Sequence, residues 1–299
     1  MLAVWGWKNE EMEFGVVFPQ TEIGGDVGAV RAFAEAAEGL GYKHLIAYDH
    51  VLGADKSVHT TLNGPYDISN TFHEPMVLFG FLAGITNLGF ATGIMISPQR
   101  QTALLAKQAA EVDLLTGGNR LRIGVGIGWN TVEYEAMGQD FSTRAKRIEQ
   151  QIPLLRKLWS EPKVTSRDDF DTVTAAGLCP MPLTQPIPIW MGGGADVVLD
   201  RVGRLADGWF PMAWPGHGLE EQRAKVIAAG EAVGRDMTNF PLEGQLAWGG
   251  NVDRAMTFAQ GWRSAGTTHL SINTLGAGCT KVDDHILGLT EMATALGIA

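Results

Sequence analysis

Eight short apolar runs alternate with amphipathic helical patterns along the chain, and this alternation constrains the fold more than any other feature. The runs are mostly continuous, which is typical of strands that are buried on both faces of a parallel sheet. We expect strands at 14–18, 44–48, 89–96, 121–125, 187–191, 208–212, 243–248 and 268–273. Eight β–α units in 299 residues predict an α/β fold, a (β/α)8 TIM barrel with inserted loops. An open doubly wound sheet is the alternative, but it usually needs fewer strands.

Local signals mark the ends of several intervening helices. Asp26 is a candidate N-cap of the first helix, and Gly41 stands where its C′ glycine belongs. Pro75 occupies the first position of the second helix, and glycines 117 and 118 end the third. The spacing of the third helix predicts a buried face through Leu104, Gln108, Val112 and Leu115.

Two segments exceed what a simple barrel requires, although we expect residues 1–299 to form a single domain. Residues 53–72 form a long polar loop that could act as a lid, and its turn at 63–65 could direct Tyr66 toward a pocket. Residues 162–186 first alternate in polarity and then carry several prolines, which predicts an inserted hairpin and linker.

Charge and composition exclude several function classes. The formal net charge is −10 and no run of basic residues stands out, so nucleic acid is not an expected partner. Residues 75–99 carry no charge, but a break at 86–89 leaves each half too short to span a bilayer, so we expect buried core rather than a membrane segment. Residues 1–12 lack the apolar region of a signal peptide, and the two cysteines form no framework; both observations favour a cytoplasmic location.

Active sites of such barrels lie at the carboxyl ends of the strands, and this rule selects glycine-rich segments of the chain. Gly192, Gly193 and Gly194 precede a predicted helix, so their N–H groups could bind a cofactor phosphate; the alternative is a flexible turn. Gly126 and Gly128 lack the spacing of a dinucleotide fingerprint and would instead let a flat ring lie against the backbone.

His50 follows the second predicted strand and is suited to proton transfer near neutral pH. From chemistry alone, a histidine satisfied by a loop carbonyl explains it equally well. Trp129 and Trp214 lie just past strand ends and are candidate pocket walls. The sequence holds neither a metal-binding cluster such as HExxH nor a GxSxG elbow, so neither a metal nor a serine hydrolase is expected.

Seven short motifs, in order along the chain, resemble the luciferase-like monooxygenase superfamily, and most closely its branch of coenzyme F420-dependent oxidoreductases. Each motif is weak by itself, but together they span about residues 13–214. They are Tyr48-Asp49-His50, Phe72-His73-Glu74-Pro75, the segments 92–101 and 106–111, 124–129 followed by Glu133 and Glu135, Trp190-Met191-Gly192-Gly193, and Ala206-Asp207-Gly208-Trp209.

The resemblance implies a (β/α)8 barrel, usually dimeric, that binds a deazaflavin or flavin at the carboxyl end of the strands. It implies a ring over the third strand, next to a non-proline cis peptide that by position is Ile94–Met95, and places His50 beside the reactive carbon of the ring as proton donor or acceptor. The implied cofactor-binding residues are Asp49, Ile94, Met95, Ser97, Gly126, Gly128, Gly192, Gly193, Gly194 and Ala195.

The chain also departs from the sugar-phosphate dehydrogenases of this branch. They carry an acidic residue where this chain has Trp129, and Thr and Lys where it has residues 212–215. Trp129, Met212 and Trp214 therefore favour an apolar or aromatic small-molecule substrate. The leading hypothesis is hydride transfer with F420, catalysed by His50 in a homodimer. An FMN-dependent monooxygenase that uses O2, and a non-catalytic flavin- or deazaflavin-binding protein, are the alternatives.

Overall fold

Every apolar run expected from the sequence is a strand of one parallel sheet in the computed structural model, which describes residues 12–299. The barrel strands are β1 (Glu13–Val17), β2 (His44–Ala47), β3 (Gly89–Thr92), β5 (Leu121–Gly126), β8 (Ile189–Gly192), β9 (Gly208–Phe210), β10 (Glu243–Ala247) and β11 (His269–Asn273). They pair in the order β10-β11-β1-β2-β3-β5-β8-β9. A single bridge between Trp209 and Leu242 joins β9 to the start of β10, so the barrel is nearly closed. The prediction of a (β/α)8 barrel is confirmed.

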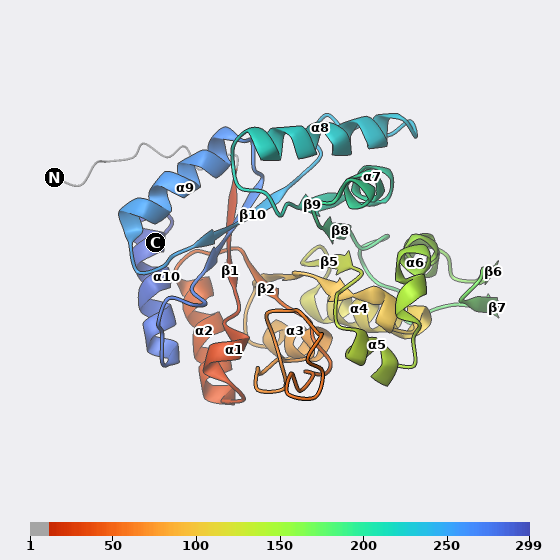
Figure 1. The fold of residues 1–299 in the computed structure, drawn as a ribbon, viewed down its shortest axis with the longest axis horizontal. Helices are drawn as coiled ribbons and strands as arrows, with labels where there is room; N and C mark the ends of the chain where they lie inside the picture. The colour runs from red at the N-terminus through yellow and green to blue at the C-terminus, as the bar shows by residue number, and fades with distance from the viewer. Residues whose placement is uncertain (1–11) are drawn as a thin grey trace.

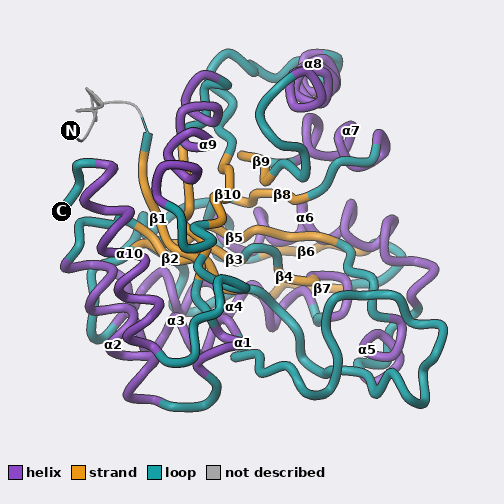
Figure 2. The backbone as a smooth tube through the Cα atoms, turned by 60° about the vertical axis from the view of Figure 1, so that its left-hand side comes forward, coloured by secondary structure: helices purple, strands orange, loops and turns teal. Residues whose placement is uncertain are grey.

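Helices surround these strands, as Figures 1 and 2 show. They are α1 (Gln20–Ile23), α2 (Val27–Gly39), α3 (Pro75–Ala83), α4 (Thr102–Thr116), α5 (Thr131–Ala136), α6 (Arg144–Ser160), α7 (Asp196–Leu205), α8 (His217–Glu231), α9 (Val252–Ser264) and α10 (Val282–Leu296). The predicted ends hold where local chemistry fixes them: the Asp26 carboxylate accepts hydrogen bonds from two N–H groups at the start of α2, and Pro75 is the first residue of α3.

The insertion ahead of β8 contains the expected hairpin. Strands β6 (Val164–Arg167) and β7 (Thr172–Ala176) pair antiparallel and project beyond α6 (Figure 1).

The prediction of which face of α4 is buried was wrong, because Leu104 and Leu115 are 54% and 61% exposed. The buried side of α4 is instead built on small residues such as Ala106 and Ala109, which let α4 pack closely against its neighbours.

The third predicted strand is interrupted, and the structure moves the cis peptide by one residue. The strand ends as β3 at Thr92 and resumes as β4 (Met95–Ile96), which pairs with β5. The cis bond is Gly93–Ile94, so the expectation of Ile94–Met95 was wrong. A Cβ atom on Gly93 would lie 2.4 Å from Ile46 Cγ2, so only glycine lets the chain pass this close to β2.

The inner wall of the barrel has unusually few side chains near its carboxyl end. TIM barrels are usually filled by bulky branched residues. Here β5 has glycine at two alternate positions, Gly124 and Gly126, and β8 ends in Gly192. A Cβ atom would meet Thr92 and Phe210 at Gly124, and Ile94 at Gly126 and Gly192. These glycines let Ile94 and Phe210 approach the backbone of β5 and β8 closely.

The uncharged stretch 75–99 lies in α3, β3 and β4 and contributes Phe79, Leu82 and Phe90 to the core, as expected. Among residues 12–299 no helix combines the length and the apolar character that crossing a membrane requires. The expectation about a signal peptide falls mainly on residues 1–11, which lie outside the described part of the chain.

Candidate active site

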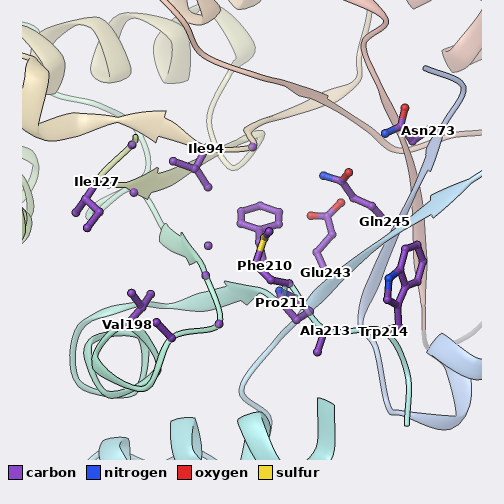
Figure 3. Close-up of a pocket in the computed structure, with 18 of the residues that line it drawn as sticks. Ile94, Ile127, Val198, Phe210, Pro211, Ala213, Trp214, Glu243, Gln245 and Asn273 are labelled. Carbon is purple, nitrogen blue, oxygen red and sulfur yellow. The ribbon is translucent and has the colours of Figure 1, made fainter. Parts of the chain in front are cut away.

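A cavity of about 670 Å³ opens at the carboxyl ends of the strands (Figure 3). This volume is in the range of cofactor and small-molecule sites. Nine of the predicted site residues line it: Ile94, Gly126, Gly128, Gly192, Gly193, Gly194, Ala195, Met212 and Trp214. Five others do not line it: Asp49, His50, Met95, Ser97 and Trp129.

One side of the cavity is backbone at the N-terminus of α7. Gly193 has a φ of +141°, and a Cβ atom there would lie 2.5 Å from Val198 Cγ1, so this turn requires glycine. Ala195, the N-cap residue, offers no side chain to cap the helix. The first N–H groups of α7 are therefore suited to an anion such as a phosphate. The one acidic side chain of this turn, Asp196, is paired with Lys225 at 2.6 Å.

Apart from its floor, the rest of the cavity wall is apolar. Ile94 points from the β3–β4 connection toward Gly126, where a Cβ atom would lie only 2.3 Å from Ile94 Cδ1. Phe210 stands opposite Ile94, as Figure 3 shows. At the rim, Met212 and Trp214 are 75% and 57% exposed, so both are available to a bound molecule. A flat ring would fit between these apolar side chains and the backbone at Gly126 and Gly192, which we call the glycine wall.

The imidazole of His50 is held by a buried carboxylate. His50 Nδ1 lies 3.3 Å from Glu133 Oε2, and Glu133 also accepts a hydrogen bond from Gln99 Nε2 at 3.1 Å. The N–H groups of Val51 and Leu52 donate to the other oxygen of Glu133. Burial raises the pKa of Glu133, but these hydrogen bonds outweigh burial and leave the pKa lowered. An ionised carboxylate can only accept, so Nδ1 of His50 carries the proton.

Three aromatic rings surround the same imidazole. The ring centroids of Phe72, Tyr66 and Trp129 lie 4.7, 5.4 and 5.5 Å from that of His50. Phe72 and Tyr66 belong to the connection between β2 and α3, residues 48–74, which we call the β2–α3 loop. This loop also packs on Trp129: a Cβ atom on Gly64 would lie 2.0 Å from the indole ring. The expected lid segment therefore covers His50, and Tyr66 lies on His50 instead of in the cavity.

Asp49 lies beneath the site as an anchor for the backbone. Its two carboxylate oxygens accept hydrogen bonds from Arg100 Nη1 and Nη2, each at 2.7 Å. One oxygen also accepts from the N–H of Ile96 at 2.9 Å. Asp49 thus ties the end of β2 to β4, beside the buried residues Met95 and Ser97.

The floor of the cavity is polar, which the sequence reasoning missed. Glu243, Gln245 and Asn273 line it, from β10 and β11. Glu243 is buried, accepts hydrogen bonds from His44 and Ser271, each at 2.6 Å, and lies 3.0 Å from Arg122. Burial opposes ionisation of Glu243, but His44 and Arg122 hold its pKa well below the usual range.

Two signals in the sequence were available for the missed residues. Glu133 stands in one of the seven motifs, in which the resemblance gives it no role. Glu243 and Gln245 stand at i and i+2 in an expected strand, and alternation places them on one face. Because most of the expected strands are continuous apolar runs, the alternation in this one strand was not used to predict a polar face.

Comparisons with known proteins agree with this architecture. A family model described as luciferase-like monooxygenase matches residues 12–276. An uncharacterized protein of Mycobacterium tuberculosis, Rv0940c, is 34% identical over 208 residues, which cover 68% of this chain and 71% of that protein. The FMNH(2)-dependent dimethylsulfone monooxygenase of Pseudomonas putida is 28% identical over 216 residues, or 70% of this chain and 56% of that protein.

Two solved structures are similar over almost the whole chain. One is an F420-dependent secondary alcohol dehydrogenase in complex with an F420-acetone adduct, with a TM-score of 0.76, 15% identity and coverage of 96% of this chain and 99% of that chain. The other is the monooxygenase RslO1 from Streptomyces bottropensis, with a TM-score of 0.75, 17% identity and coverage of 95% and 98%. At these identities the two structures bear on the fold alone.

Proposed function

The chain belongs to the luciferase-like monooxygenase family, and from that premise we propose that it is an F420-dependent oxidoreductase acting on an apolar or aromatic organic substrate. The observation that carries this proposal is the glycine-walled cavity at the uncapped N-terminus of α7. It suits a flat ring system with a phosphate, which both a deazaflavin and a flavin provide.

The fit can be assigned residue by residue. Gly193, Gly194 and Ala195 would hold the phosphate through backbone N–H groups. Ile94 would support the ring, and Gly126 and Gly192 let Ile94 lie against the backbone there, since Cβ atoms at these positions would lie 2.3 and 3.1 Å from its side chain. When bound, the cofactor supplies hydride chemistry, and the protein supplies binding, orientation and proton transfer.

His50 is assigned the proton that accompanies hydride transfer. Its Nδ1 is bound to Glu133, and among residues 12–299 no group hydrogen-bonds its Nε2. Nε2 is therefore free to take or give a proton. Since Phe72, Tyr66 and Trp129 surround the ring of His50, the β2–α3 loop would control its access to a ligand.

A second candidate is an FMN-dependent monooxygenase that uses O2. The similarity to the Pseudomonas putida enzyme, whose name includes FMNH(2), favours it. The same backbone site would serve either cofactor, so cofactor identity separates the two candidates.

The experiment is a fluorescence titration of the purified apoprotein with F420 and, separately, with FMN at matched concentrations. Tighter binding of F420 supports the hydride-transfer proposal, and tighter binding of FMN supports the monooxygenase. Binding of neither contradicts both. His50→Ala should then slow turnover far more than it weakens cofactor binding, and equal losses would contradict the assigned role.

We also propose a cytoplasmic homodimer with a small-molecule substrate. The family resemblance supports the dimer, and light scattering coupled to size-exclusion chromatography tests it by the mass in solution. A monomer mass at micromolar concentration would contradict it.

A further inference from the structure

A chain of hydrogen bonds runs along the carboxyl ends of three strands and finishes at the cavity. The N–H of Leu275 donates to Asn273 Oδ1 at 2.9 Å. Asn273 Nδ2 donates to the hydroxyl of Tyr48 at 3.3 Å. The Tyr48 hydroxyl in turn donates to Gln245 Oε1 at 2.8 Å. Asn273 and Tyr48 each receive one hydrogen bond and give the next, and Gln245 receives the last.

The direction of this chain is fixed at its start. A backbone N–H can only donate, so the oxygen of Asn273 must face Leu275 and its amide nitrogen must face Tyr48. Burial raises the pKa of Tyr48, which therefore keeps its proton at neutral pH. With a hydrogen bond arriving from Asn273, the proton of Tyr48 is directed to Gln245. The amide oxygen of Gln245 thus accepts the Tyr48 proton, and this hydrogen bond fixes the orientation of the Gln245 amide group.

The amide nitrogen of Gln245 is left facing the cavity. Figure 3 shows it directed away from Asn273 and toward the space between Ile94 and Phe210. Within residues 12–299 no group accepts a hydrogen bond from it. The nearby carboxylate of Glu243 is engaged by His44, Ser271 and Arg122. A pair of fixed donors therefore meets a cavity whose other walls are mainly apolar.

We propose that Gln245 recognises an acceptor oxygen on the substrate, with Tyr48 and Asn273 as positioning residues. The substrate class is then a molecule with an apolar body and one carbonyl-type oxygen, such as a ketone, enone or aldehyde. This inference rests on the proposed function, because it places the substrate beside a ring that occupies the glycine wall. A donor held in place before the ligand arrives needs no reorganisation on binding.

The test compares ligands that differ only in that oxygen. The probes are acetophenone with α-methylstyrene, and cyclohexanone with methylenecyclohexane, each added to protein saturated with whichever of F420 or FMN it binds. Ligand-observed NMR gives the affinities. One neutral hydrogen bond should favour at least one ketone over its alkene by roughly three- to tenfold. The carbonyl carbon of that ketone, labelled with ¹³C, should move downfield on binding, as hydrogen-bonded carbonyls do.

Three variants locate the donor. Gln245→Leu keeps the volume and should abolish both the preference and the downfield shift. Tyr48→Phe removes the hydrogen bond that orients the amide, so the preference should fall by less. Met212→Leu changes an apolar position of the same cavity and should alter both members of each pair equally. Cofactor affinity, measured by the titration above, should be the same in Gln245→Leu as in the wild type.

Two results would overturn the proposal. One is a wild-type protein that binds neither ketone more tightly than its alkene. The other is a Gln245→Leu variant that loses cofactor affinity while keeping the ketone preference, which would assign the amide to the cofactor. Failure of the proposed function is a separate outcome, because it appears in the cofactor titration of the wild type, as tighter binding of FMN than of F420 or as binding of neither.

Discussion

Glu133→Gln should reverse the tautomer of His50 while leaving the shape of the site intact. In the wild type the carboxylate of Glu133 accepts the Nδ1 proton of His50. A glutamine can keep its oxygen on the N–H groups of Val51 and Leu52, which puts its amide nitrogen where Oε2 stands. That nitrogen donates, so Nδ1 of His50 must become an acceptor and the proton moves to Nε2. The nitrogen proposed to exchange a proton with the substrate then starts protonated, so it can no longer accept one.

The same substitution carries a stability cost that can be worked from the contacts. Hydrogen bonds to a charged group contribute about 1.5–3 kcal/mol, and neutral ones about 0.5–1.5 kcal/mol. Two backbone donors lose about 1 kcal/mol each, and the donating nitrogen of Gln99 now faces another donor. Because the side chain of Glu133 is only 1% exposed, solvent does not offset these losses. We expect destabilisation by about 2–3 kcal/mol.

Two assays and a matched control test this reasoning. Long-range ¹H–¹⁵N NMR of the imidazoles reports the tautomer of His50, and urea unfolding reports stability. Glu135→Gln is the control, since Glu135 lies two residues further along α5 and is exposed. It should change neither measurement. A His50 that keeps its Nδ1 proton in Glu133→Gln would refute the proposed role of Glu133.

Two glycines and the partly buried His269 lead to three further predictions. Gly193→Ala forces a side chain into a φ of +141° and against Val198, so we expect about 1–3 kcal/mol of destabilisation by thermal unfolding, with weaker cofactor binding. Burial beside a guanidinium lowers the pKa of His269 to about 3, so the unfolded chain binds a proton below pH 6.5 that the folded protein does not. Stability should therefore fall from pH 6.5 toward pH 4 by up to about 1.4 kcal/mol per pH unit, and His269→Gln should flatten this slope in urea unfolding. Gly64→Ala should push the β2–α3 loop off Trp129 and speed its cleavage by trypsin, and an unchanged rate would contradict the packing role of this glycine.

The barrel could be predicted because local and global signals agree. Continuous apolar runs at regular intervals have few solutions other than parallel strands separated by helices, and caps such as Asp26 mark helix ends by short-range chemistry. The face of α4 could not be predicted from the leucines alone. Its alanines pack more closely than leucines would, and only the neighbouring elements determine which side is inward.

The site was predictable where it depends on backbone and not where it depends on long-range pairing. Glycines at strand ends imply close approach by a ligand whatever surrounds them, and those of β5 and β8 do line the cavity. The contact between His50 and Glu133 joins residues 83 positions apart, and that between Tyr48 and Gln245 joins residues 197 apart. Spacing along one sequence carries no information about such pairs.

The cavity has two kinds of wall, the glycine wall and a wall of exposed side chains, and the two can change at different rates during evolution. Where a wall is main chain, its shape is set by the sheet, and at Gly126 or Gly192 any substitution adds volume and crowds Ile94. Where the wall is an exposed side chain, as at Met212 and Trp214, substitution reshapes the opening without disturbing the barrel. A lineage built this way can keep one cofactor for a long time while it exchanges one substrate for another.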